Sequence, residues 1–202
     1  MSEPFFSVIV PAHNSAKYIR RLLDSIKAQT FLGYELIVVC DSCTDDTALI
    51  ASEYTDSVYQ VEYGRDGLTR NAGLNAATGK WVLFADDDDW WLHEFAFQLL
   101  YNVLNEYGEA IDILAFDFIW AKKGYAPQHQ YLTAAVWNKA WRREFIGDTR
   151  FPGIWSTSDA VFHKNMMEKN PRVITYNTPL YYYNYMREGS ITWIDEHGPD
   201  NL

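Results

Sequence analysis

One stretch, Trp81–Trp91 (WVLFADDDDWW), constrains the fold more than any other part of the chain. Its apolar run, Trp81–Ala85, is short and contains β-branched and aromatic residues, which is typical of a strand buried on both faces. Four aspartates, Asp86–Asp89, follow at the carboxyl end of this predicted strand, where open α/β sheets bind their ligands. In extended backbone, Asp86 and Asp88 would point to one side and Asp87 and Asp89 to the other, so that one pair could face a ligand while the other holds the loop.

Adjacent carboxylates repel one another, and a divalent cation would relieve that repulsion. Hard cations such as Mg²⁺ and Mn²⁺ prefer oxygen ligands. The aspartate run therefore predicts a metal site at the edge of a sheet. The simpler alternative is a solvated acidic turn that caps the next helix.

Two earlier apolar segments have the same form and also end in polar loops. Phe6–Val10 precedes the loop 11–15, and Glu35–Cys40 precedes the loop 41–47. Helical spacing follows at 16–29, 47–54 and 67–77, with Asn14 or Ser15 expected to cap the first helix. A short strand is expected at Val58–Val61. This alternation predicts βαβ units, a mostly parallel sheet flanked by helices, and three polar loops on one edge. Neither GxGxxG nor GxxxxGK[ST] occurs, so a dinucleotide fold and a P-loop are not supported.

The remainder of the chain continues the α/β pattern without a linker. A helix is expected over 94–107, a strand over 112–120, a helix over 134–145, and a turn and helix over 156–167. The helix 134–145 would carry the basic residues Lys139, Arg142 and Arg143, either as a phosphate grip or as a solvated face. We expect one domain over 1–202, with a nucleotide-binding half at about 1–91 and an acceptor-binding half at about 92–202.

Charge and composition limit the classes of function. The chain has 17 basic and 27 acidic residues and a formal net charge of −10, which disfavours broad contact with nucleic acid. No stretch is long and apolar enough to span a membrane, and the start lacks the basic region of a signal peptide. Cys40 and Cys43 form a lone CxxC, too few ligands for structural zinc, and we expect both reduced. These features predict a cytoplasmic protein, free or at the inner face of the membrane.

Five segments in order resemble the family 2 glycosyltransferases, inverting enzymes with a GT-A fold. They are SVIVPAHN, CDSCTDDT, GLTRNAGLNAATGKWVLFADDDDWW, VWNKAWRREF and YYYNYMREGSIT. The resemblance covers about Phe6 to Thr192, and the third segment, with its Arg-Asn-x-Gly helix and D-x-D element, is the most specific. Cys40 stands where an acid is common, which leaves Asp41 alone at the end of the second strand.

The resemblance implies roles for residues of the donor site. Asp41 would hydrogen-bond the base of a nucleotide sugar, in a pocket lined by Pro11, Ala12 and Asn14. Arg70 would lie near the sugar or the diphosphate. Asp86 would face the ribose, Asp87 is counted with the substrate-binding residues, and Asp88 would carry a Mg²⁺ or Mn²⁺ ion that bridges the diphosphate.

The acceptor side needs a general base, because the attacking hydroxyl must lose its proton. The family usually supplies it from a Glu-Asp pair that opens a helix, and this chain has Ser158-Asp159 in that place. We assign Asp159 as the base; the alternative is a helix N-cap. Trp155 is expected to stack an acceptor sugar. Arg187 would neutralise the leaving diphosphate or be a surface arginine, and His197 would be a further metal ligand or an uncommitted residue of the tail.

The expected function is metal-dependent, inverting transfer of a sugar from a UDP-sugar to a hydroxyl of a carbohydrate or glycolipid, in cell-surface polysaccharide or glycoconjugate synthesis. One alternative is a nucleotidyltransferase, which would favour a Gly/Arg-rich loop after the first strand instead of PAHNS. Others are a non-catalytic nucleotide-sugar-binding module and a sugar transferase that modifies DNA. The donor sugar, the linkage and the oligomeric state are not predicted.

Overall fold

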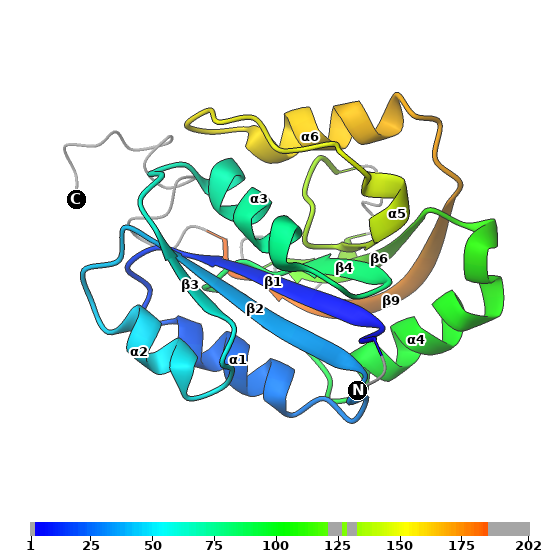
Figure 1. The fold of residues 1–202 in the computed structure, drawn as a ribbon. Coiled ribbons are helices and arrows are strands. Elements are labelled where there is room, and N and C mark those ends of the chain that lie inside the picture. Colours follow the sequence, from blue (N-terminus) through cyan, green and yellow to red (C-terminus); the bar gives the residue numbers. More distant parts are fainter. Residues whose placement is uncertain (1–2, 121–126, 129–132, 186–202) are drawn as a thin grey trace.

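The chain alternates strands and helices up to the aspartate run and then adds antiparallel pairings (Figure 1). The computed structural model describes residues 3–120, 127–128 and 133–185. The first part comprises β1 (Phe6–Ala12), α1 (Ile19–Lys27), β2 (Tyr34–Asp41), α2 (Thr47–Ser52), β3 (Val58–Val61), α3 (Asp66–Ala76), β4 (Trp81–Phe84) and β5 (Trp90–Trp91). The second comprises α4 (Ala96–Tyr107), the 3-10 turn η1 (Gly108–Ala110), β6 (Ile113–Trp120), β7 (Pro127–Gln128), β8 (Lys139–Arg142), α5 (Arg143–Ile146), α6 (Ser158–Met167) and β9 (Val173–Tyr183).

A single sheet runs through both parts in the order β3-β2-β1-β4-β8-β6-β9-β5, with β7 paired to β6. The strands β3, β2, β1 and β4 are all parallel, with Val8 of β1 between Leu36 of β2 and Leu83 of β4. β8 is antiparallel to both β4 and β6, whereas β9 is parallel to β6. The parallel strands therefore end together at one edge, as the sequence predicted.

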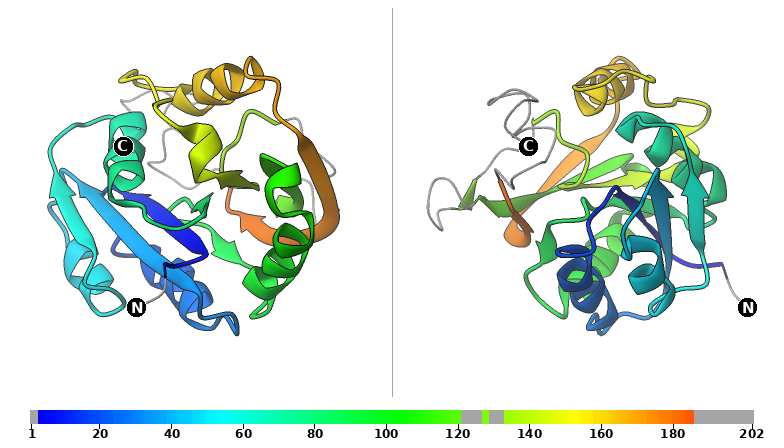
Figure 2. Two further views of the ribbon diagram at one scale, coloured as in Figure 1. Left: turned by 45° about the vertical axis from the view of Figure 1, so that its right-hand side comes forward. Right: turned by 90° about the vertical axis from the view of Figure 1, so that its left-hand side faces the viewer.

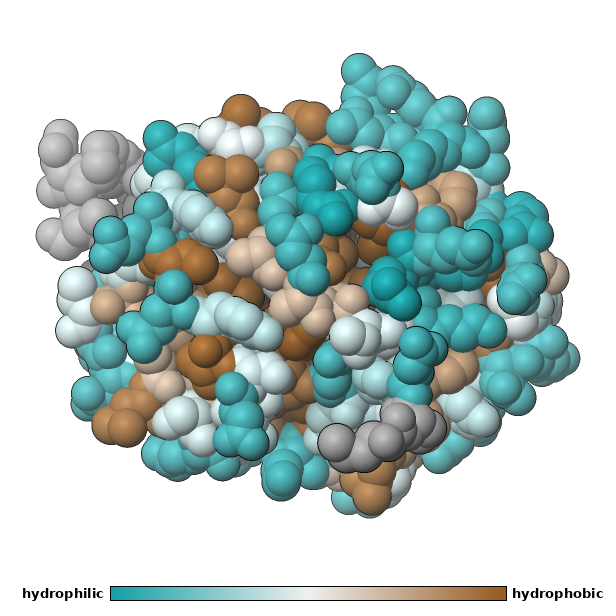
Figure 3. All heavy atoms as spheres, in the orientation of Figure 1, coloured by the Kyte–Doolittle hydropathy of each residue, from teal (hydrophilic) through white to brown (hydrophobic). Residues whose placement is uncertain are grey.

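Helices cover both faces of this sheet, and alternate strand residues supply two cores (Figures 1 and 2). On one face, Val8 and Leu83 pack with residues of α1 and α4 such as Leu22 and Phe97. On the other face, Ile9 packs with residues of α3, α5 and α6. Burial of strand residues on both faces explains why β1, β2 and β4 read as continuous apolar runs. The outer surface seen in Figure 3 is largely hydrophilic, with apolar residues scattered over it.

Gly73 lets α3 lie directly on the sheet. A Cβ atom at this position would overlap the Ile9 side chain of β1. A glycine in the interior of a helix costs about 0.5–1 kcal/mol relative to alanine, so its presence here reflects close packing. This contact sets how closely α3 approaches the sheet.

The predicted helix over 134–145 is wrong. This segment forms the strand β8 and the short helix α5, and it pairs with strands on both sides. Because β8 lies inside the sheet, Ala140 and Trp141 are fully buried. Lys139 is buried as well, and its ammonium donates to the carbonyls of Thr133 and Ala135 and to Asn138 Oδ1.

The predicted basic helix face therefore does not exist. Arg142 Nη2 lies 2.5 Å from Asp112 Oδ1, and Arg143 Nε donates to the carbonyl of Gly79. The expected cap of the first helix is also wrong: α1 begins at Ile19 after Tyr18, with no side-chain cap hydrogen bond. Asn14 instead accepts hydrogen bonds from Thr44, in the loop after β2.

Candidate active site

The loops after β1, β2 and β4 interlock at the carboxyl edge of the parallel strands. Asn14 Oδ1 accepts a hydrogen bond from Thr44 N at 2.8 Å, and Ser15 N donates to Thr47 Oγ1 at 2.8 Å. The loop after β1 also reaches the aspartate run, since His13 N donates to Asp87 Oδ2 at 3.1 Å. The sequence prediction that these three loops share one edge is confirmed.

The aspartate run is a turn and not the expected extended segment, because Asp89 N donates to the carbonyl of Asp86 at 3.1 Å. The predicted division into pairs nevertheless holds. Asp86 and Asp88 are partly exposed, whereas Asp87 and Asp89 are buried. The capping alternative is not supported, because α4 begins after Phe95 without a side-chain cap hydrogen bond.

Strand β9 and the residue that follows it hold this turn through hydrogen bonds. Asp86 N donates to the Tyr181 hydroxyl at 3.0 Å, and Asn184 N donates to Asp89 Oδ1 at 2.7 Å. Burial, together with the charges of Asp88 and Asp86, raises the pKa of Asp89 well above its ordinary range. No sequence motif assigns a role to Tyr181; the available signal is its place in a tyrosine-rich segment, which favours an ordered structure.

Asp41 lies under the loops and is almost saturated with hydrogen bonds. Its Oδ1 accepts from Ser42 Oγ, Tyr63 N and Gly64 N, and its Oδ2 accepts from Arg65 N and Thr69 Oγ1, at 2.8–3.2 Å. Burial opposes ionisation, but these donors outweigh it and lower the pKa of Asp41. The carboxylate thus fixes the chain between β3 and α3, and its contact with a nucleotide base stays a prediction.

Arg70 is buried among three carboxylates from different parts of the chain. Its Nη1 lies 2.5 Å from Asp66 Oδ2 and 3.4 Å from Asp159 Oδ1, and its Nη2 lies 2.7 Å from Asp86 Oδ1. Its side chain is only 6% exposed. Its Nε has no hydrogen-bond partner among the described residues, and the expected place of Arg70 near a sugar or diphosphate stays a prediction. In the structure its charge organises the acidic groups.

Asp159 lies in the first turn of α6, and the cap alternative is wrong because Thr157 occupies the N-cap position. Its side chain is 23% exposed. Val136 N donates to Oδ2 at 3.4 Å, and Oδ1 has no hydrogen-bond partner among the described residues. Burial raises the pKa of Asp159, Arg70 lowers it, and Asp86 and Asp66 raise it, with a net value of about 6. A carboxylate of this kind is suited to accept a proton near neutral pH.

The segment before α6 is strained and exposes aromatic surface beside the site. Thr157 has φ 63° and ψ 16°, a left-handed conformation that is costly for a β-branched residue. Trp155 is 52% exposed, and the Arg65 guanidinium lies 5.6 Å from its ring centroid. An exposed ring here fits the predicted sugar-stacking role, which stays a prediction.

The other predicted site residues lie in different settings. Pro11 and Ala12 are buried at the end of β1, and Asn14, with φ 45°, is exposed in the loop that follows. Arg187 and His197 lie outside the described residues. His163, half-buried one turn beyond Asp159, has a pKa lowered to about 4 by burial and by Lys139.

The donor set suits a hard cation with few protein ligands. Within the described ranges, no group of three or more His, Cys, Asp or Glu side chains forms a preorganised metal site. Mg²⁺ is usually held by one or two carboxylates plus substrate phosphates. The partly exposed carboxylate of Asp88, at the tip of the turn, fits that arrangement.

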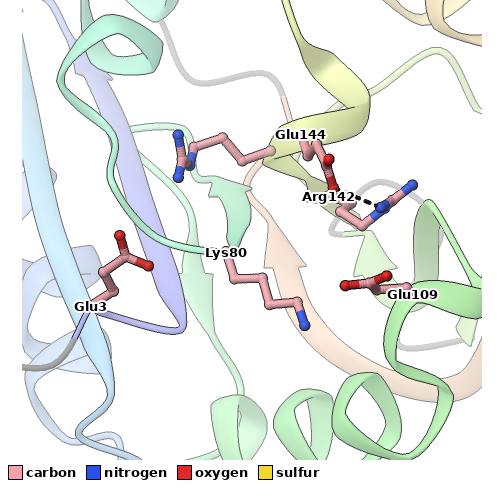
Figure 4. A pocket seen from close by; sticks show the side chains of 6 residues that line it. Glu3, Lys80, Glu109, Arg142 and Glu144 are labelled. Atoms are coloured by element: carbon pink, nitrogen blue, oxygen red, sulfur yellow. Dashed lines mark hydrogen bonds and ion pairs between the residues drawn. The ribbon is translucent and has the colours of Figure 1, made fainter.

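A hollow of about 370 Å³ lies elsewhere, at the opposite edge of the sheet (Figure 4). Its walls carry charges of both signs, from Glu3, Lys80, Glu109, Arg142, Arg143 and Glu144. Arg142 is already paired with Asp112 and Glu144. This hollow is separate from the acidic loops and contributes nothing to them.

Fold and site together define an α/β protein with a cluster of acidic side chains at the carboxyl edge of its parallel strands. Residues 7–179 match the model of Glycosyl transferase family 2, so the chain belongs to that family. The putative glycosyltransferase EpsH of Bacillus subtilis is 30% identical over 211 residues, which cover 91% of this chain and 61% of EpsH.

A second relative is known in structure. Poly(ribitol-phosphate) beta-N-acetylglucosaminyltransferase TarS of Staphylococcus aureus is 42% identical over 93 residues, 42% of this chain and 16% of TarS. The crystal structure of a TarS fragment in complex with UDP-GlcNAc superposes with a TM-score of 0.82 at 28% identity, and covers 93% of this chain and 60% of that chain. The fold is therefore GT-A-like, as the sequence predicted.

The chain spans about 61% of EpsH and about 60% of the matched TarS fragment. Within the residues that the structure describes, no helix has the length and apolar character needed to cross a membrane.

Proposed function

We propose that this protein transfers a sugar from a UDP-sugar to a hydroxyl group of a carbohydrate or glycolipid acceptor, with inversion at the anomeric carbon. The donor would bind to the half up to Trp91 and the acceptor to the half beyond it. Support for a UDP-sugar comes from the TarS fragment, whose structure was solved with UDP-GlcNAc.

One observation carries the proposal: the carboxylate of Asp159 lies beside the loops at the strand ends, with a raised pKa and one oxygen that accepts no hydrogen bond from residues in the described ranges. Its Oδ1 has no hydrogen-bond partner within the described part of the chain, and its pKa is about 6. Arg70 joins it to Asp86, the first residue of the aspartate turn. These contacts support the assignment of Asp159 as a proton acceptor beside the turn that we assign to the donor.

The reaction balances with these groups. The acceptor oxygen bonds to the anomeric carbon, the bond from that carbon to the diphosphate oxygen breaks, and UDP departs. The acceptor proton passes to Asp159. Asp88 would hold Mg²⁺ or Mn²⁺ against the diphosphate, where such an ion stabilises the charge of the leaving group. Most of the rate would come from holding the two substrates in line.

The acceptor class follows from the relatives and from one exposed ring. TarS is a poly(ribitol-phosphate) beta-N-acetylglucosaminyltransferase, and a further relative, GgaB of Bacillus subtilis, is a minor teichoic acid biosynthesis protein. We therefore propose a role in cell-surface polysaccharide or glycoconjugate synthesis. Trp155 would stack on the apolar face of an acceptor sugar, a contact that aromatic rings make readily.

A thermal-shift panel of nucleotide sugars, each with Mn²⁺ and with EDTA, tests the donor half. UDP and one UDP-sugar should stabilise the protein with Mn²⁺, by about 2.7 kcal/mol at 100 times the dissociation constant. Equal stabilisation in EDTA would remove the metal from the proposal. The stabilising donor is then incubated with the protein and a panel of carbohydrate and glycolipid acceptors, and UDP release is measured. Binding without any release of UDP would favour a non-catalytic binding module.

A further inference from the structure

Asp66, the first residue of α3, links Arg70 to the start of α6, the helix that carries the proposed base Asp159. Its Oδ2 accepts from Arg70 Nη1 at 2.5 Å and from Ser158 Oγ at 2.7 Å. Arg70 contacts Asp159, and Ser158 directly precedes Asp159 in α6. The Asp66 carboxylate thus contacts both Arg70, the counter-ion of the proposed base, and Ser158, the residue before that base.

The backbone around Asp66 is packed too tightly for these contacts to be incidental. A Cβ atom at the next residue, Gly67, would lie 2.5 Å from the carbonyl oxygen of Pro152 and 3.1 Å from the Ser158 Cβ. The start of α3 therefore lies directly against the segment that leads into α6. Asp66 Oδ1 is buried and has no hydrogen-bond partner among the described residues, an arrangement that costs stability unless another requirement maintains it.

The charges around Arg70 do not cancel. One guanidinium faces Asp66, Asp86 and Asp159, and its contact with Asp159, at 3.4 Å, is the longest of the three. An arginine that is shared in this way neutralises each carboxylate less than a dedicated partner would. Without Asp66, Arg70 would be free to form a closer pair with Asp159.

We propose that Asp66 is a positioning residue, which holds Arg70 away from full pairing with Asp159 and fixes the first turn of α6 through Ser158. Asp159 then keeps Oδ1, which accepts no hydrogen bond from the described residues, for the acceptor hydroxyl. The inference rests on the proposed function for its meaning in catalysis, but the control of Asp159 by Asp66 can be measured without any substrate.

Several charged groups face Asp159, and Asp66 is one that raises its proton affinity. From α3 come Arg70 and Asp66, from the loop after β4 comes Asp86, and from β8 comes Lys139. Both the negative charge of Asp66 and its hold on Arg70 act in the same direction. Removing the Asp66 charge should therefore lower the pKa of Asp159 from its value of about 6.

The test is a pH titration of protein labelled with ¹³C at aspartate carboxyl carbons, with the Asp159 signal assigned by its loss in Asp159→Asn. Asp66→Asn keeps the size of the side chain and its ability to accept from Ser158 while removing the charge. We expect the Asp159 midpoint to fall by about one pH unit, a roughly tenfold loss of proton affinity. Asp66→Ser is a second variant without the charge, for use if Asp66→Asn does not fold.

The matched control is Ser158→Ala, which removes the hydrogen bond to Asp66 and keeps the charge. Its Asp159 midpoint should stay within a few tenths of a unit of the wild-type value. An unchanged or raised midpoint in Asp66→Asn would overturn the proposal, and so would an equal fall in Ser158→Ala. If the fall occurs only without the Asp66 charge but the wild-type protein releases no UDP, the proposed function fails and the control of Asp159 by Asp66 stands.

With an active donor, kinetics separate positioning from general damage. In Asp66→Asn, the acid limb of the plot of kcat against pH should move to lower pH by the same amount as the Asp159 titration midpoint. The KM for the donor should change by less than about threefold, because Asp66 lies on the Asp159 side of Arg70. A large rise in KM with an unmoved acid limb would instead assign Asp66 to donor binding.

Discussion

The hydroxyl of Tyr181 accepts a hydrogen bond from the backbone N–H of Asp86 at 3.0 Å, across a sequence separation of 95 residues. Tyr181 is fully buried in β9, and Asp86 opens the acidic turn after β4. The last described strand therefore fixes the backbone of the loop that we assign to the donor. Burial and the neighbouring Asp89 and Asp86 charges raise the pKa of Tyr181, so the hydroxyl stays protonated.

Tyr181→Phe should loosen the turn while leaving the core filled. The variant loses the acceptor for Asp86 N, and an unsatisfied buried group costs about 1–3 kcal/mol. We expect that loss in urea unfolding, together with weaker Mn²⁺-dependent stabilisation by UDP. Tyr182→Phe, at the next position of β9, is the control. Equal effects of the two substitutions would contradict a specific role for the Tyr181 hydroxyl.

Substitution of Asp88 should impair metal-dependent UDP binding, whereas substitution of Asp87 should reduce the stability of the fold. Asp88→Asn, at a partly exposed position, should change the free energy of unfolding by less than about 0.5 kcal/mol and abolish the Mn²⁺-dependent stabilisation by UDP. Asp87→Ala leaves the N–H of His13 without its acceptor, which should cost about 1–3 kcal/mol. Its UDP binding should persist at temperatures where it is folded. Both properties are read from thermal unfolding with and without UDP and Mn²⁺, and loss of metal-dependent binding in both variants would show that the assignment of Asp88 alone is wrong.

The parallel half and its polar edge were predictable because local pattern and tertiary burial agree there. The apolar runs of β1, β2 and β4 are buried on both faces, so their continuity in sequence has a direct physical cause. The segment 134–145 misled because short apolar runs fit a helix and a strand equally well. A strand inside the sheet requires burial of Lys139. No sequence pattern shows that three oxygens from neighbouring residues will accept hydrogen bonds from its buried ammonium.

Within the site, residue types were easier to predict than their partners. Arg70 and Asp86 stand out in the sequence, but the contact of Asp66 with Ser158 joins residues 92 positions apart. The only local signal for Asp66 was its spacing of four residues from Arg70, which places both on one side of a helix. That spacing is common on helix surfaces, so it did not distinguish a buried cluster.

Asp41→Asn should destabilise the protein strongly. Asparagine offers one acceptor oxygen, so its amide group would face donors that now bind a carboxylate, and the expected loss is about 3 kcal/mol. The folded-state pKa of Asp41 is lowered, so its contribution is present above the unfolded pKa of about 3.9 and disappears as pH falls through the folded value. Urea unfolding from pH 3 to pH 7 checks this. A loss independent of pH would show that the charge is not what matters.

Asp159→Asn should separate stability from chemistry. Because the pKa of Asp159 is raised to about 6, the folded protein binds a proton that the unfolded chain has released between about pH 4 and pH 6. The wild-type protein therefore loses stability relative to Asp159→Asn as pH rises through that window, by on the order of 2 kcal/mol. At pH 8 the variant should be the more stable protein, and at pH 4 the difference should be small.

The same substitution should remove the proposed reaction without removing the donor. Asparagine keeps the size of the side chain but cannot take the acceptor proton, a contribution of about 10²- to 10⁴-fold to the rate. UDP binding with Mn²⁺ should stay within a few-fold of wild type, because Asp159 contacts Arg70 and not the tip of the aspartate turn. Steady-state transfer rates and the thermal shift with UDP measure the two properties on one sample. Near-normal turnover would exclude Asp159 as the base, whereas a parallel loss of UDP binding would move it to the donor side of the site.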